Sequence, residues 1–179
     1  MNTGVLGNAL PYVQEDFNKP HLFNSHYMAT KDQKVTIYVA PDIYSLKGKG
    51  PFDYQIEVKS ATLAATPLLD VKDQLTAQDP AFKADFANRA HHKSFNLKMA
   101  ANQFYIIDMK APPGTNLDSY LYLLDSAAKV VRSDDDSGGF PNARIVFQAP
   151  KDGDYRIIAT GLGQALGNFA LTVRTTEKK

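Results

Sequence analysis

Apolar and polar residues alternate with a period of two between residues 117 and 173, and turn-forming segments interrupt this pattern. Side chains two residues apart lie on the same face of a strand, so the period is typical of strands that bury one face. The interrupting segments 136–139, 150–153 and 161–163 are rich in Gly, which reaches left-handed backbone angles at low cost. The residues expected to share faces are Tyr120, Tyr122 and Leu124; Ile145 and Phe147; Tyr155, Ile157 and Ala159; and Phe169, Leu171 and Val173.

The pattern predicts seven strands of one antiparallel sandwich, with little helix. Short strands that are separated by turns every 8–12 residues or so favour a sandwich or barrel. The paired prolines of residues 111–116 place that segment in a loop, because proline is excluded from central strands. We expect strands at residues 93–99, 103–109, 119–124, 129–132, 143–148, 154–160 and 168–174, with Leu121, Leu123, Tyr155, Ile157, Phe169 and Leu171 buried between the sheets.

Composition narrows the class of protein. The 179 residues are 44% hydrophobic, which is enough for a sizeable core. Cysteine is absent, which excludes disulfides, thiolate metal sites and cysteine nucleophiles. A net charge of +1 gives no broad attraction to nucleic acid, and no apolar run is long enough to cross a membrane. No signal peptide is expected in the first residues, which lack a basic segment followed by an apolar one.

The chain contains a weak internal repeat. Residues 31–39 align with 151–159, and 50–58 align with 167–173, in the same order and with the same alternation. We therefore expect residues 1–60 to be the C-terminal half of one sandwich, 61–68 to be a linker and 69–176 to be a complete sandwich. Half a sandwich leaves strand edges open, so the fragment would dock on its neighbour, be completed by a second chain or belong to a longer array. The alternative is that two meandering β segments resemble each other by chance.

Several motifs together carry a resemblance to a known family. They are Ser94-Phe95-x-Leu97, Tyr105-x-Ile107-Asp108, Asp118-x-Tyr120-Leu121-x-Leu123, Asp134-Asp135-Asp136, Pro150-x-x-Gly153-x-Tyr155 and Gly167-Asn168-Phe169-x-Leu171-x-Val173. This set resembles the bacterial pre-peptidase C-terminal domain, a jelly-roll β-sandwich appended to secreted enzymes and surface proteins. The resemblance covers residues 69–175 and, in part, 5–58. It implies an all-β, antiparallel jelly-roll β-sandwich, one complete unit plus a partial tandem repeat, in an extracellular or cell-envelope protein.

The aspartates of residues 134–136 are the leading candidates for metal ligands. Calcium prefers six to eight hard oxygen ligands, roughly, and neighbouring carboxylates beside glycines supply some of them. We expect Asp134 and Asp136 to lie on the same side of an extended chain, with Asp118 approaching from a strand start, so calcium is the expected cofactor. The alternative is a solvated hairpin tip whose carboxylates accept hydrogen bonds from turn amides.

The calcium site of the collagenase relatives does not transfer to this chain. The resemblance implies that those relatives bind calcium through an acidic segment before the first strand and an Asp ahead of the strand matching 93–99. This chain lacks the acidic segment, and His91-His92-Lys93 stands at the place of that Asp. An EF-hand-like loop is also excluded, because Ile145 stands where its Glu would be.

Other motifs have structural interpretations. The segment from Gly161 to Gly167 leads into a strand and no helix, so it is a hairpin loop and not a dinucleotide site. His91 and His92 are adjacent, so in a strand they point to opposite faces and do not chelate one ion. The nucleophile motif Gly-x-Ser-x-Gly is absent, and we do not expect an enzyme. Phe140, in a loop beside the acidic run, is the candidate exposed aromatic for binding.

The sequence therefore favours a non-catalytic extracellular or cell-envelope module that binds or positions. The expected partner is a matrix polymer, a polysaccharide or other domains of the parent protein, and neither nucleic acid nor membrane insertion is expected. Two alternatives remain open. One is a structural spacer or secretion-linked folding domain without its own ligand, and the other is a small jelly-roll hydrolase.

Overall fold

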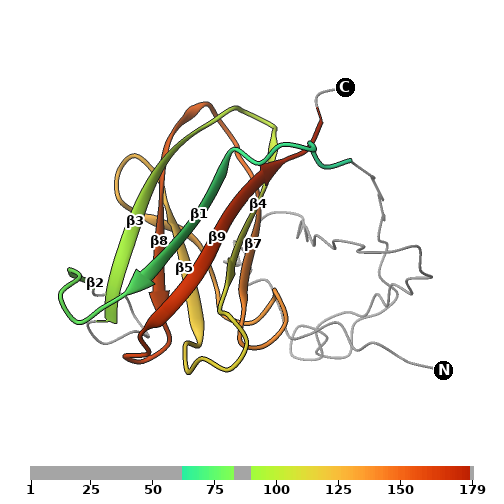
Figure 1. The fold of residues 1–179 in the computed structure, drawn as a ribbon. Coiled ribbons are helices and arrows are strands. Elements are labelled where there is room, and N and C mark those ends of the chain that lie inside the picture. The colour runs from blue at the N-terminus through green and yellow to red at the C-terminus, as the bar shows by residue number, and fades with distance from the viewer. Residues whose placement is uncertain (1–61, 83–89, 178–179) are drawn as a thin grey trace, which may run out of the picture. The chain divides into compact units, whose positions relative to one another are not determined.

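A computed structural model describes residues 62–82 and 90–177, and in these residues the chain forms nine strands and no helix (Figure 1). None of the described residues therefore belongs to a helix that could cross a membrane. The expected partial repeat at residues 1–60 lies outside the described residues. The strands are β1 (Leu69–Leu75), β2 (Ala81–Phe82), β3 (Ala90–Met99), β4 (Phe104–Lys110), β5 (Ser119–Leu124), β6 (Val130–Asp134), β7 (Ala143–Gln148), β8 (Gly153–Gly161) and β9 (Gly167–Thr175).

The strands form two antiparallel sheets. One sheet has four strands in the order β1-β9-β4-β7, and the other has five in the order β2-β3-β8-β5-β6. Every strand pair is antiparallel. The all-β sandwich expected from the alternation is confirmed, and all seven expected strands occur with ends shifted by at most a few residues. The jelly-roll connection order and the partial repeat stay predictions.

Strand β1 is a strand that the sequence analysis did not list. Leu69, Val71 and Leu75 alternate with polar residues, but Asp73 occupies the third position of the same face and hides the pattern. The partner that stabilises this strand is far away in the sequence, because Leu69 pairs with Val173. Residues before β1 also bond to β9: the Ala64 amide donates to the Thr175 carbonyl (2.8 Å), and the Leu68 amide donates to the Val173 carbonyl (2.7 Å).

Most connections cross from one sheet to the other. Strands β6 and β7 belong to different sheets, and so do β8 and β9. The acidic segment after β6 and the glycine segment after β8 are therefore not hairpin loops, as the sequence had suggested, but bridges between the two layers. Local alternation shows that a strand exists and which faces it has, whereas the choice of sheet depends on contacts between distant residues.

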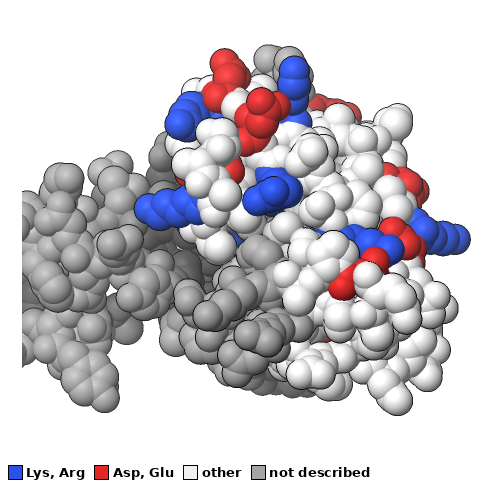
Figure 2. All heavy atoms as spheres, turned by 90° about the vertical axis from the view of Figure 1, so that its left-hand side faces the viewer, with Lys and Arg blue, Asp and Glu red and all other residues white. Residues whose placement is uncertain are grey.

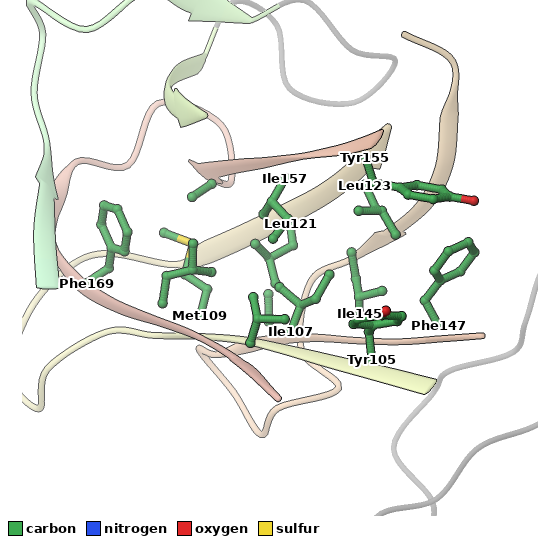
Figure 3. Packing of buried hydrophobic residues seen from close by; sticks show 14 of the residues in the cluster. Tyr105, Ile107, Met109, Leu121, Leu123, Ile145, Phe147, Tyr155, Ile157 and Phe169 are labelled. Atoms are coloured by element: carbon green, nitrogen blue, oxygen red, sulfur yellow. The ribbon is translucent and has the colours of Figure 1, made fainter. Parts of the chain in front are cut away.

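The core lies between the two sheets (Figure 3). It is filled by alternate side chains of β4, β5, β7, β8 and β9, as the period of two requires. The residues expected to be buried from the sequence are buried, with no more than 4% of the surface of any of them exposed: Leu121, Leu123, Tyr155, Ile157, Phe169 and Leu171.

Strand β5 is buried on both faces. Leu121 and Leu123 point into the core, whereas Tyr120, Tyr122 and Leu124 point to the opposite face and form a second buried cluster with Ile158 of β8. The rings of Tyr120 and Tyr122 lie 4.8 Å apart, between their centroids. A strand that is enclosed on both sides has little freedom to shift its register, so β5 is a fixed reference for the loops at its ends.

Leu171→Ala is expected to lower the free energy of unfolding by about 2–5 kcal/mol, because it leaves a cavity between the sheets. Leu171 is 0% exposed and belongs to the central strand β9. Urea unfolding measures the change, with Leu68→Ala as the control, since Leu68 is 51% exposed. The control should change stability by no more than about 0.5 kcal/mol. Equal effects of the two substitutions would contradict the described core.

Candidate functional site

Ser119 lies where three loops meet at one end of the sandwich. Its side chain is fully buried, and its hydroxyl oxygen lies 3.1 Å from the Met109 carbonyl and 3.0 Å from the Pro141 carbonyl. The same oxygen accepts a hydrogen bond from the Ala143 amide (2.8 Å). The Ser119 amide donates to the Pro141 carbonyl (3.0 Å). We call residues 111–118, 135–142 and 162–166 the Ser119 end, because these bonds and the next ones fix them to one another.

Backbone hydrogen bonds fix the acidic residues of the Ser119 end. The Leu162 amide donates to the Asp118 carbonyl (2.8 Å), which joins the segment after β8 to the start of β5. In the segment after β6, the Gly139 amide donates to the Asp136 carbonyl (2.8 Å). Gly139 has a φ of +91°, and a Cβ at Gly138 would lie 2.6 Å from the Asn142 carbonyl oxygen, so this turn requires both glycines. The acidic segment is therefore a built turn with a defined conformation.

Three carboxylates converge at the Ser119 end. Asp118, Asp135 and Asp136 each have an oxygen within 4.8 Å of the others, and among the described residues they are the one group of three acidic or histidine side chains arranged in this way. The structure thus brings together two of the residues expected from the sequence, Asp118 and Asp136. The third member is Asp135 and not Asp134. Strand β6 ends at Asp134, and the chain bends directly after it, so the alternation expected for an extended chain stops there.

Asp134 has a different function, in the turn itself. Its Oδ2 atom accepts hydrogen bonds from the Ser137 amide (3.0 Å) and the Arg144 amide (2.7 Å), so it joins the two ends of the β6–β7 connection. The Arg144 side chain in turn donates a hydrogen bond to the carboxylate of Asp108 in β4 (2.5 Å). Asp108 is buried, with 7% of its surface exposed. These contacts place Asp134 among the groups that shape the loop.

Burial and the neighbouring negative charges make ionisation of two of the three carboxylates, Asp118 and Asp135, unfavourable. Burial, together with the charges of Asp136, Asp118 and Asp134, raises the pKa of Asp135 to about 6. Burial also raises the pKa of Asp118, with a further contribution from Asp136. Two oxygens of the group, Oδ1 of Asp118 and Oδ1 of Asp135, are buried and accept no hydrogen bond. The three carboxylates therefore repel one another, and two of their oxygens have no hydrogen-bond donor.

Phe140 is exposed beside this group. It lies four residues after Asp136, and 77% of its surface is accessible, the highest value among the large exposed hydrophobic residues that the structure describes. Leu162 and Leu166, in the neighbouring segment of the Ser119 end, are each 37% exposed. The only charged residues of the Ser119 end are Asp118, Asp135 and Asp136. The surface therefore combines apolar side chains with negative charge alone.

His91 and His92, the histidines among the described residues, lie elsewhere and have structural partners. A ring nitrogen of His91 lies 2.6 Å from the Asp79 carbonyl, and one of His92 lies 2.8 Å from the Pro80 carbonyl. Both rings are thus fixed to the turn between β1 and β2. The sequence analysis did not single out two residues of this site, Ser119 and Asn142. The Asn142 side chain accepts a hydrogen bond from the Ala111 amide (2.9 Å) and donates one to the Gly139 carbonyl (2.8 Å). A small polar residue at the start of an apolar strand was the available signal for Ser119.

Comparison with known proteins shows a similarity to one family over part of the chain. A family model described as the bacterial pre-peptidase C-terminal domain matches residues 90–161, from the first residue of β3 to the last of β8. The resemblance inferred from the sequence motifs is therefore confirmed for this part of the chain. The matched part contains Ser119, the three carboxylates and Phe140. No curated protein matches the chain.

Two solved structures are similar at low identity. The pre-peptidase C-terminal domain of a collagenase from Bacillus anthracis is 13% identical, with 66% of this chain and 99% of that chain covered and a TM-score of 0.45. PliG of Aeromonas hydrophila, a periplasmic inhibitor of g-type lysozyme, is also 13% identical, with 68% of this chain and 92% of that chain covered and a TM-score of 0.43.

Asp134→Ala is expected to lower the free energy of unfolding by about 1–3 kcal/mol, because two backbone amides lose their acceptor. Asp136→Ala is the matched control, since Asp136 is exposed and adds to the repulsion within the group. Measured in chelator by urea unfolding, the control should retain or exceed the stability of the parent protein. A loss in Asp136→Ala that equals the loss in Asp134→Ala would show that the turn does not depend on the Asp134 carboxylate.

The raised pKa of Asp135 predicts a pH dependence of stability in chelator. In the folded state the Asp135 carboxyl group keeps its proton up to a pH of about 6, whereas in the unfolded chain it loses the proton near pH 3.8. The resulting stabilisation is complete below pH 3.8 and is lost as the pH rises through about 6. In a parallel series of thermal melts, Asp135→Asn should remove this part of the dependence. Asp70→Asn, at an exposed position of β1, should leave it unchanged, and an identical profile for both variants would refute the prediction.

Proposed function

We propose that this sandwich is a non-catalytic module of an extracellular or cell-envelope protein, which binds a polymer or protein partner through the Ser119 end and positions the parent polypeptide there. The observation that carries the proposal is the exposed side chain of Phe140 on a loop held by the buried Ser119. The family match over residues 90–161 supports a module of this class and an extracellular or cell-envelope location. Parent-protein domains and matrix polymers or polysaccharides are the proposed partners.

The fixed geometry of the loop favours recognition. An exposed aromatic side chain gives a large contact area, and a loop that is already ordered loses little entropy when it binds. Phe140 meets both conditions, because the residue after it, Pro141, accepts a hydrogen bond from the buried strand start. Binding groups on loops above a rigid scaffold are the usual arrangement in β-sandwiches.

The charge of the Ser119 end indicates the chemistry of the partner. Its three charged residues are all acidic, so it suits a neutral or basic surface better than a polyanion such as nucleic acid. Figure 2 shows a face of the molecule on which Lys and Arg lie among Asp and Glu, separated by uncharged side chains.

The shape of the described surface supports a binding module over a hydrolase. Two depressions, of about 560 and 300 Å³, are open to solvent and lie outside the Ser119 end, apart from the contribution of Pro112 to the larger one. Asp152 and Asp154 are among the residues that line the smaller one, but the Asp152 carboxylate accepts a hydrogen bond from the Ala101 amide (2.8 Å) and so has a structural partner. A catalytic carboxylate pair works best in a site that excludes water.

Phe140→Ala is expected to weaken binding to the partner by about tenfold or more, as is typical of a central aromatic contact. The measurement is co-sedimentation of the purified full chain with collagen fibrils, chitin, cellulose and peptidoglycan, followed by titration on the polymer that retains it. Leu68→Ala is the matched control: Leu68 is also an exposed apolar residue, but it lies beside Val173 near the opposite end of β9. The control should bind as the parent protein does.

Two results would contradict the proposal. Equal binding by Phe140→Ala and the parent protein would exclude the Ser119 end as the binding surface. Absence of binding to every polymer, together with absence of binding to the isolated neighbouring domains of the parent protein, would instead identify the module as a structural spacer.

A further inference from the structure

We propose that Asp118, Asp135 and Asp136 form a calcium site that joins the start of β5 to the connection between β6 and β7. Asp118 directly precedes β5, and the other two residues directly follow β6. One oxygen from each carboxylate lies within 4.8 Å of the others. The inference does not depend on the proposed binding partner, because it concerns an ion and the stability of the fold.

The unpartnered oxygens are an observation independent of the acidic composition. Oδ1 of Asp118 and Oδ1 of Asp135 each have less than 1 Å² of accessible surface and accept no hydrogen bond. Buried acceptors are almost always paired, and a buried carboxylate oxygen without a donor destabilises the folded state. The neighbouring Asp134 shows the ordinary arrangement, since its Oδ2 atom accepts from two amides. One cation between Asp118 and Asp135 would provide the missing partner for both buried oxygens.

The donor set selects calcium among the common divalent ions. All three ligands are carboxylates, and hard oxygen donors favour calcium or magnesium over zinc and copper. Calcium–oxygen distances of about 2.3–2.6 Å place opposite ligands about 4.6–5.2 Å apart, whereas magnesium requires about 4.1 Å. Oxygens that lie up to 4.8 Å apart thus fit around one calcium ion without a large rearrangement. Water is expected to fill the coordination positions that the carboxylates leave open.

The loops hold these ligands in place before an ion arrives. The Asp118 carbonyl accepts from the Leu162 amide, and the Asp136 carbonyl accepts from the Gly139 amide, each at 2.8 Å. Ser119 adds contacts to both sides of the site, through the Pro141 carbonyl and the Ala143 amide. Binding therefore costs little conformational entropy, and the ion offsets the repulsion of three neighbouring negative charges. The unfolded chain does not bring Asp118 near the other two residues, so calcium stabilises the folded state specifically.

The test is a thermal melt of the full chain with calcium chloride and with chelator, together with calorimetric titration of calcium chloride. At a free calcium concentration about 100 times the dissociation constant, the ratio of folded to unfolded protein should rise about 100-fold, and the melting temperature rises accordingly. Magnesium chloride at the same concentration should have a much smaller effect. No heat of binding and an unchanged melting temperature at about 10 mM calcium would overturn the proposal, since even weak extracellular sites bind near 1 mM or below.

Variants test whether the calcium-dependent shift in melting temperature arises from this site. Asp118→Asn and Asp136→Asn should each abolish the calcium-dependent shift, whereas Asp70→Asn on β1 should retain it in full. The quantity compared is the shift between calcium and chelator, because removing one charge from the group alters the stability of the metal-free protein as well. Asp135→Asn should melt at a higher temperature than the parent protein in chelator and should gain nothing from calcium. A calcium shift that persists in both Asp118→Asn and Asp136→Asn would place the ion elsewhere and refute the assignment.

Discussion

The packing of one sheet against the other is the interaction on which the rest of the structure depends. Ile107 of β4 and Leu171 of β9 lie in one sheet, Leu121 of β5 and Ile157 of β8 lie in the other, and all four are completely buried between them. Because most connections cross between the layers, consecutive strands usually contribute to opposite walls of the same core. No strand pair is therefore stable without the facing sheet, and the fold is cooperative throughout.

The loops at the Ser119 end are ordered because they are hydrogen-bonded to a strand of this core. Leu121 and Tyr122 fix β5 on both faces, and Ser119, at the start of the same strand, holds Pro141 and Ala143 through hydrogen bonds. The exposed Phe140 and the three carboxylates are thus anchored to the most enclosed strand of the module. A polar residue can be fully buried there because its hydroxyl is satisfied by the backbone of two other segments. Ordered loops and a buried anchor are what a recognition surface requires.

Alternation along the chain predicted the strands and the buried residues of β5, β8 and β9, because these depend on local period and on burial of one face. It did not reveal β1, where Asp73 interrupts the pattern, or which sheet each strand joins, since both depend on distant partners. At the candidate site, residue type singled out Asp118 and Asp136. Residue type and alternation did not favour Asp135 over Asp134, because that choice follows from a bend directly after β6.

The pairing of β1 with β9 has a consequence for how the protein is made. The first described strand hydrogen-bonds along its whole length to the last one, from Leu69 with Val173 to Leu75 with Gly167. Synthesis proceeds from the N-terminus, so β1 has no partner until about a hundred further residues have emerged. Pairing of strands so far apart in the sequence makes folding slow. The four-stranded sheet is therefore completed only after nearly the whole of the described chain has been made.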